Sequence, residues 1–205
     1  MTPISIAALS GLFCLQGLWC TATSTTPQAN AQPEPTYETY TVTMTAYNAV
    51  PGQTDDSWEY TSIGAYTNPD IIAARSRDMA DELPYGTVID VLPATTTPNC
   101  GFKFVDEKIG LRVIGDSMAD HSTLTGALIR QKIDILLEEE PISAQNGLMR
   151  NPAKALGYCR NVQIVVVGKI DLYTNGKIDP AKVRKIPKTQ GELAAAVGLA
   201  KLALK

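Results

Sequence analysis

Short stretches rich in β-branched and aromatic residues recur along this chain, and longer polar connections containing Gly and Pro separate them. Within these stretches apolar and polar residues alternate, which is the two-residue period of a β-strand. The sequence therefore predicts strands at 36–48, 71–74, 87–92, 101–105, 110–116, 131–137 and 161–173. Many short strands with long connections favour a small closed β-barrel or a sandwich.

Helical signals are few. The segment 76–83 is long enough for at most two turns, and 121–131 is a candidate short helix. A third helix is expected at 151–158, because Pro152 suits the first helical turn and Asn151 suits the cap before it. The predicted fold class is therefore all-β with short helices.

The first 31 residues contain no Asp, Glu, Lys or Arg, and their apolar run is followed by small polar residues. This pattern is typical of a secretory signal, with cleavage expected before Gln32. A lipoprotein anchored at Cys20 is the alternative, although the residues before Cys20 are larger than is usual at such sites. We expect an exported protein, secreted or periplasmic, with a signal peptide at 1–31, a linker at 32–41, a barrel domain at 42–173 and a C-terminal tail at 174–205.

The tail from Thr174 is basic, is interrupted by Pro180 and Pro187, and ends in an amphipathic helix expected to begin near Gln190. Such a segment could contact an anionic envelope surface. The alternative is a solvated appendage packed loosely on the barrel, which is common at chain ends. In either case we expect the tail to be dispensable for folding.

Two cysteines, Cys100 and Cys159, remain after removal of the signal. They either pair in an oxidising compartment or stay as two separate buried thiols. With a single histidine, His121, the mature chain has no residue set with the count or spacing of a zinc site, so neither metal nor cofactor is expected. The chain has no Gly-rich nucleotide motif, and its net charge of -3 gives no reason to expect nucleic acid.

One acid stands out inside the β-branched run 131–137. Alternation sends Ile133 and Ile135 to one face of the strand and Asp134 to the other, together with Lys132. Most acids in such runs simply lie on an exposed face. The role of Asp134 therefore depends on what else the chain places around it.

Five segments in order, at 44–56, 71–91, 112–118, 132–136 and 153–168, resemble the 3D (Asp-Asp-Asp) domain family. This family is similar to the catalytic core of the membrane-bound lytic transglycosylase A type and to Sps- or YuiC-like proteins. The resemblance covers residues 42–170 and implies a six-stranded double-psi β-barrel. The strand pattern points the same way.

The resemblance also implies site residues. It places family acids at Asp116 and Asp134, and a third at Asp78, with Asp81 close by in the sequence. Thr45 and Tyr47 match residues that line a sugar groove. The interval between Asp116 and Asp134 is longer than in relatives, so the extra residues either reshape the groove or let Asp120 replace Asp116.

The resemblance implies that these acids cleave the MurNAc-GlcNAc bond of peptidoglycan, and carboxylates suffice for such glycosidic chemistry. One carboxyl can protonate the glycosidic oxygen and then take the proton of the C6 hydroxyl as that oxygen closes on C1, which yields a 1,6-anhydro product. Burial and the like charge of Asp116 would raise the pKa of Asp134 and keep it able to donate. Asp116 would stabilise the developing positive charge, and Lys132 would contact the glycan.

Two functions stay open at this point. The first is a monomeric, exported lytic transglycosylase or related glycosidase that acts on peptidoglycan glycan strands. The second is a non-catalytic, expansin-like barrel that binds cell-wall polysaccharide. Function resides in the site rather than in the fold, so the arrangement of the acids distinguishes them.

Overall fold

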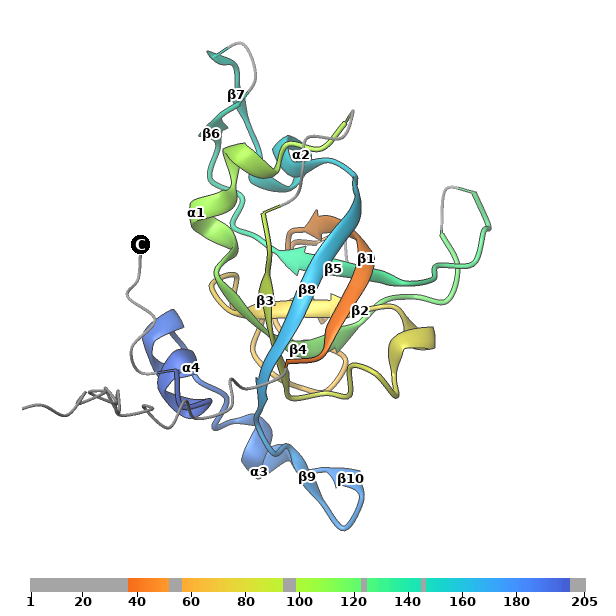
Figure 1. Ribbon diagram of the computed structural model, residues 1–205, viewed down its shortest axis with the longest axis vertical. Helices are drawn as coiled ribbons and strands as arrows, with labels where there is room; N and C mark the ends of the chain where they lie inside the picture. Colours follow the sequence, from red (N-terminus) through yellow and green to blue (C-terminus); the bar gives the residue numbers. More distant parts are fainter. Residues whose placement is uncertain (1–36, 52–56, 94–98, 123–124, 145–146, 200–205) are drawn as a thin grey trace, which may run out of the picture. The chain divides into compact units, whose positions relative to one another are not determined.

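The computed structural model describes residues 37–51, 57–93, 99–122, 125–144 and 147–199 (Figure 1). The predicted signal peptide, its cleavage site and Cys20 lie outside the described residues, as do residues 32–36 of the predicted linker and the last six residues of the tail. Among the described helices, none has the length and apolar character needed to cross a membrane.

Six strands form a closed barrel, which is one of the two architectures that the strand pattern favoured. Around the barrel they follow the order β1-β5-β2-β4-β3-β8. Their bounds are β1 Thr39–Tyr47, β2 Ile72–Arg75, β3 Thr87–Val91, β4 Leu111–Ser117, β5 Lys132–Leu136 and β8 Cys159–Lys169. Two pairs, β1 with β5 and β2 with β4, are parallel, and the other four are antiparallel.

Alternation along the strands divides their side chains between the barrel interior and its outer surface. Met44 of β1 and both Ile133 and Ile135 of β5 are fully buried in the interior cluster. Asp134, between the two isoleucines, takes the opposite face, as the period-two pattern predicted. The outer surface is thus where the polar side chains of β1 and β5 gather.

The C-terminal tail covers another part of this outer surface. It contains a small hairpin (β9 Tyr173–Thr174 and β10 Lys177–Ile178), α3 (Pro180–Val183) and α4 (Gln190–Ala196). Val183 and Leu193 are buried in a second apolar cluster with Val88, Val113 and Leu136 of the barrel strands. The expectation of a loosely packed appendage is therefore wrong.

Hydrogen bonds fix the tail as well. The side-chain amide of Gln190 accepts from Leu111 N (2.9 Å) and donates to Leu111 O (2.9 Å), so it mimics a neighbouring strand at the start of β4. Asn68 Nδ2 donates to Lys188 O (2.7 Å). The sequence favoured a solvated tail because the segment is basic and interrupted by proline, and only the fold shows that its apolar residues meet one surface.

The predicted strand at 101–105 is a 3-10 helix, η2 (Phe102–Phe104), followed by the short helix α1 (Asp106–Ile109). Phe102 and Val105 are buried whereas Lys103 is exposed. Burial at positions three apart fits a 3-10 turn better than the alternation of a strand. The prediction of a strand here was therefore wrong.

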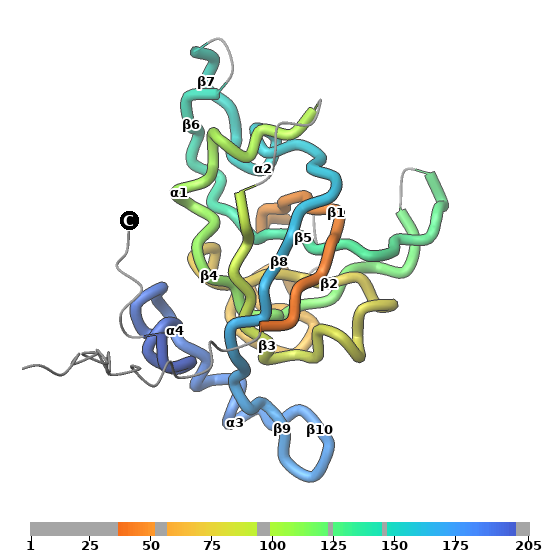
Figure 2. Tube along the Cα trace, in the orientation of Figure 1, coloured from red at the N-terminus to blue at the C-terminus, as the bar shows by residue number. Residues whose placement is uncertain are grey.

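The predicted helix at 121–131 is also absent from the described residues. His121 instead forms an isolated antiparallel bridge with Leu128, and Ile129 N donates to Asp120 O (2.9 Å). Figure 2 shows this connection between β4 and β5 reaching away from the barrel. Its side chains are mostly exposed, so no apolar face was available to hold a helix there.

Two other helix predictions are confirmed. A single 3-10 turn, η1 (Arg77–Met79), occupies the segment that allowed at most two turns. Helix α2 (Pro152–Leu156) begins at Pro152, and the side chain of Asn151 accepts hydrogen bonds from Ala153 N and Lys154 N. A two-stranded sheet of β6 (Ile142–Ser143) and β7 (Met149–Arg150) precedes it.

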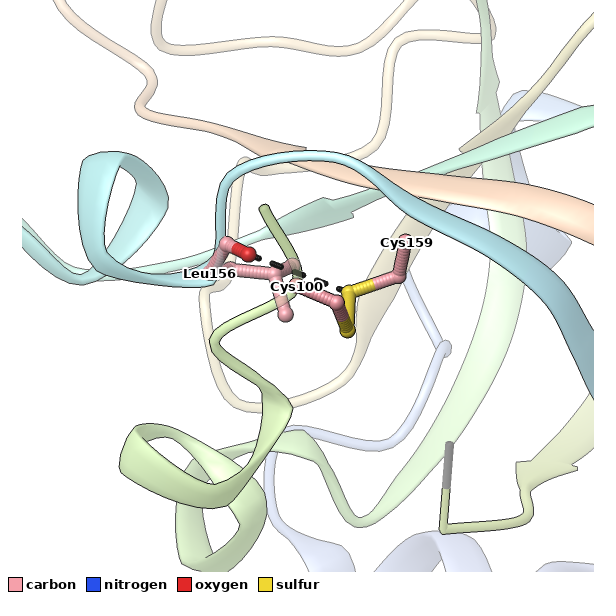
Figure 3. Close-up of a disulfide and its surroundings, with 3 residues drawn as sticks. All are labelled: Cys100, Leu156 and Cys159. Carbon is pink, nitrogen blue, oxygen red and sulfur yellow. Dashed lines mark hydrogen bonds between the residues drawn. A yellow bond between two sulfur atoms is a disulfide. The ribbon is translucent and has the colours of Figure 1, made fainter. Parts of the chain in front are cut away.

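Cys100 and Cys159 form a disulfide, with Cα atoms 4.6 Å apart (Figure 3). It ties the segment before η2 to the first residue of β8. Gly157 makes this approach feasible, because at its φ of 68° a Cβ would lie 2.6 Å from Asn99 O. Of the two alternatives that the sequence left open, pairing is the one observed.

Candidate active site

The register of the barrel strands places two acids in one row on its outer surface. Asp134 of β5 lies opposite Ala74 of β2, and Asp116 of β4 lies opposite the same Ala74 on the other side. Residues opposed in this way point to the same face of a sheet, and adjacent strands are separated by roughly 4.8 Å. The small Ala74 thus lies between Asp134 and Asp116, whose backbones are about 10 Å apart.

A bulge in β4 turns Asp116 to the outer face. Ala73 pairs with Ile114, but Ala74 pairs with Asp116, so Gly115 is the extra residue in the register. Ile114 points into the barrel, and without the bulge Asp116 would point inward as well. A Cβ at Gly115 would lie 2.8 Å from Ile72 Cδ1, so a larger residue here would require the Ile72 side chain to move.

The carboxyl of Asp134 is partly buried and held by its neighbour on β1. Thr45, the register partner of Asp134, donates a hydrogen bond from Oγ1 to Asp134 Oδ1 (2.6 Å). Burial raises the pKa of Asp134 to about 6, while the Thr45 hydrogen bond and the positive charge of Lys132 oppose that rise. The negative charge of Asp116 adds to it, though as the smallest of these influences.

Asp116 accepts hydrogen bonds from three donors. Tyr47 OH donates to Oδ2 (2.9 Å), and the backbone amides of Ser62 (2.9 Å) and Ser117 (2.8 Å) donate to Oδ1. A carboxylate acts only as an acceptor, so three donors and no acceptor suit its ionised form. The two acids therefore occupy different environments, one desolvated and one surrounded by donors.

Tyr47 is hydrogen-bonded to Asp116 and also interacts with the charge of Asp134. Its pKa is raised well above the usual value, chiefly by burial and then by the charge and hydrogen bond of Asp116, with a further contribution from Asp134. Tyr47 therefore stays a phenol and a hydrogen-bond donor at any ordinary pH. Thr45 and Tyr47 are two residues apart on β1, so each places its hydroxyl on the outer face beside one acid.

A fully buried arginine supports this row of residues. Arg112 Nη1 donates to Leu136 O (3.1 Å) and Ile72 O (3.4 Å), and its guanidinium also reaches the carbonyls of Pro69, Lys108 and Ile109. Burial lowers the pKa of Arg112 to about 9. It ties the ends of β2 and β5 to the residues before β4 through backbone carbonyls alone.

Lys132 lies two residues before Asp134 and shares its face. Its Nζ is 5.8 Å from the centroid of the Tyr158 ring, and the guanidinium carbon of Arg160 is 5.4 Å from the same centroid. The ring of Tyr158 is 43% exposed. Lys132 and Tyr158 together extend the outer face beyond Asp134 with one cation and one aromatic surface.

Two other acids considered from the sequence lie elsewhere. Asp78, in η1, accepts a hydrogen bond from Gln131 N (3.0 Å) and so holds the connection that leads into β5. Asp120 pairs with Arg77 (3.0 Å), and both side chains are largely exposed. Neither contributes to the pKa of Asp134, whereas Asp116 does.

The structure also brings residues to the site that sequence reasoning missed. Ser62 comes from a connection without any strand or helix pattern, and its Oγ accepts from Ser117 N (3.1 Å) in addition to its amide bond with Asp116. Ala74 was predicted as part of a strand only. Its position between two acids depends on the barrel register, for which the sequence carries no local signal.

Within the described part of the chain, no group of three or more His, Cys, Asp or Glu residues is arranged to hold a metal ion. Comparison of the chain with protein-family models and with curated protein sequences found no match.

Proposed function

We propose that this protein is an exported peptidoglycan lytic transglycosylase in which Asp134 is the single general acid and base. The observation that carries the proposal is the state of Asp134: a partly buried carboxyl on a barrel strand, with a pKa of about 6. A group with this pKa populates both protonation states near neutral pH, as an acid that must donate and then accept a proton requires.

In the first step the protonated carboxyl of Asp134 gives its proton to the glycosidic oxygen. The bond from that oxygen to C1 of the MurNAc residue breaks, and positive charge develops on the ring oxygen and C1. In the second step the Asp134 carboxylate takes the proton of the C6 hydroxyl as its oxygen bonds to C1. The products are a 1,6-anhydro end and a free glycan end, and Asp134 is protonated again.

The neighbours of Asp134 have supporting roles in this proposal. The Asp116 carboxylate stabilises the developing positive charge. The hydrogen bond from Tyr47 OH to Oδ2 of Asp116 orients this carboxylate. Thr45 fixes the position of Asp134 Oδ1. Lys132 and the exposed ring of Tyr158 bind the glycan beside the acid.

We also propose that the barrel is of the double-psi type and that the chain is a member of the 3D family. The parallel pairs β1–β5 and β2–β4 within an otherwise antiparallel barrel support the first statement. The order of the five similar sequence segments supports the second. In this assignment Asp116 and Asp134 are two of the family acids, and Asp78 holds the approach to β5.

An exported location fits the disulfide, because such bonds persist in oxidising compartments. The intact mass of the protein recovered from the periplasm or medium tests this part. A chain that begins at Gln32 and carries no free thiol agrees with export, and a chain that retains residues 29–31 or has two free thiols contradicts it.

The activity itself is tested with purified wild-type protein and isolated sacculi. Mass spectrometry of the released material should show muropeptides with 1,6-anhydro ends. Release of reducing ends instead would make the enzyme a hydrolase. Binding without any release would make the barrel an expansin-like binding module, in which Asp134 only contacts the polysaccharide.

A further inference from the structure

A concave surface lies apart from the residues of the proposed active site. A groove with a volume of about 640 Å³ separates the connection before β2 from the tail segment between α3 and α4. Ala65, Ile71 and Ile72 form one apolar wall, and Val183 and Ile186 form the other. This volume is in the range of small-ligand sites, which span roughly 300–1,000 Å³.

Two tyrosines border the groove with their rings in solvent. Tyr60 is 55% exposed and Tyr66 is 70% exposed. Their backbones form an isolated bridge, and the ring centroids are 6.4 Å apart at an edge-to-face angle. Exposed aromatic rings held in one place by the backbone offer contact area at little conformational cost.

The charged residues that line the groove are of one sign. Arg184 and Lys188 line it, and its lining contains no Asp or Glu. The three ion pairs found among the described residues involve neither of these two side chains. The groove thus combines apolar walls with two cations that can pair with a ligand, which fits an anionic ligand carrying small apolar groups.

One short connection, residues 60–66, contributes both to the groove and to the hydrogen bonds of Asp116. Ser62 donates its backbone N–H to Asp116 Oδ1 (2.9 Å), and Tyr60 and Tyr66 lie on either side of it in the chain. Thr61 N donates to Ala65 O (2.8 Å), and this hydrogen bond closes a loop between the two residues. A branched substrate bound at Asp116 and Asp134 could therefore send its substituent into the groove.

We propose that this groove binds the acidic stem peptide of the glycan strand on which Asp134 acts. The inference rests on the proposed function. The stem peptide is short, carries free carboxylates and has small alanine methyl groups, so it complements both the cations and the apolar walls. The glycan backbone contacts the row of Asp134, Ala74 and Asp116, and the peptide extends past Ser62.

Calorimetric titration with a synthetic stem tetrapeptide tests the groove without any need for catalysis. Wild-type protein should bind the tetrapeptide, and the double variant Arg184→Ala with Lys188→Ala should bind it at least roughly tenfold more weakly, because truncating charged partners removes the pairing. Tyr66→Ser should also weaken binding. A tetrapeptide with amidated carboxylates should bind wild type as weakly as the native tetrapeptide binds the double variant.

Lys185→Ala is the matched control, since Lys185 adjoins Arg184 in the chain, is exposed and does not line the groove. It should bind the tetrapeptide as wild type does. Unchanged thermal unfolding of each variant ensures that loss of binding is not loss of folding. No binding by wild type, or equal binding by wild type and the double variant, would overturn the proposal.

The same titration separates this inference from the proposed function. Asp134→Asn should bind the tetrapeptide as wild type does, because Asp134 is outside the groove. If wild type binds the tetrapeptide but releases no anhydro product from sacculi, the lytic activity is refuted and peptide binding by the groove is supported. If wild type releases anhydro product but does not bind the tetrapeptide, peptide binding by the groove is refuted and the lytic activity is supported.

Discussion

Thr45 Oγ1 donates a hydrogen bond to Asp134 Oδ1 over 2.6 Å, between residues that face each other in the parallel pair β1–β5. The bond favours the ionised carboxyl, whereas burial favours the protonated one. The balance leaves the pKa of Asp134 at about 6. The pKa of Asp134, and with it the pH range in which this residue can donate a proton, therefore depends on a hydrogen bond that a single substitution can remove.

Thr45→Val removes this donor with little change in volume. Because the hydrogen bond lowers the pKa of Asp134, its loss should raise that pKa, and the alkaline limb of the pH profile of kcat/KM should move to higher pH. Thr43→Val is the control, since Thr43 is on the same face of β1 but opposite Lys132. Equal profiles for the two variants would contradict the role of Thr45.

The wild-type profile itself follows from the pKa of Asp134. The acid must be protonated in the free enzyme to donate to the glycosidic oxygen. We therefore expect kcat/KM for release of anhydro product to fall about tenfold for each pH unit above about pH 6. A profile that stays flat from pH 6 to pH 8 would exclude Asp134 as the proton donor.

The same pKa predicts a stability effect. A carboxyl whose pKa is raised on folding from 3.8 to about 6 favours the folded state most at low pH, and this contribution is lost as pH rises from about 4 through 6. The Asp134→Asn variant has no charge to desolvate. At pH 7.5 its free energy of unfolding, measured by denaturant titration, should therefore exceed that of wild type by about 1–3 kcal/mol. At pH 3.5 the two proteins should be closely similar in stability.

Most of the strands and the face on which Asp134 lies could be predicted because both depend on local alternation, whereas alternation alone left a barrel and a sandwich open. Ile133, Asp134 and Ile135 alternate in the sequence as they do in the strand. Asp116, which lies on the far side of β2 from Asp134, was expected only from the family resemblance, because it reaches the outer face only through the bulge at Gly115. Ala74 meets the acids through the register of β2 with β4 and β5, and Ser62 reaches Asp116 from a turn outside the strands.

The tail was the largest error of sequence reasoning, and its physical reason is clear. Val183, Ile186 and Leu193 are separated by Pro, Lys and Gly residues, so they form no continuous apolar stripe in the sequence. The fold gathers them on the outer surface of the barrel, where Val113 and Leu136 also lie. The basic residues between them remain exposed, which is what the composition indicated.

Leu193→Ala tests this correction. The side chain is fully buried in the cluster that joins the tail to the barrel, so truncation should cost about 2–5 kcal/mol of unfolding free energy. Leu199→Ala, near the end of the described tail and only partly buried, is the control and should cost less. Denaturant unfolding measures both. An unchanged midpoint for Leu193→Ala would show that the tail is the loose appendage after all.

The central claim is that one carboxyl performs both proton transfers, and product analysis of Asp134→Asn tests it most directly. An asparagine keeps the shape and can accept from Thr45, but it cannot exchange a proton with the substrate. Asp116→Asn, which removes only charge stabilisation, should retain partial activity, and Lys132→Ala should weaken binding more than turnover. We predict that Asp134→Asn binds sacculi as wild type does and forms anhydro product roughly a hundred- to ten-thousandfold more slowly. Anhydro product from Asp134→Asn within about tenfold of the wild-type rate would contradict the claim.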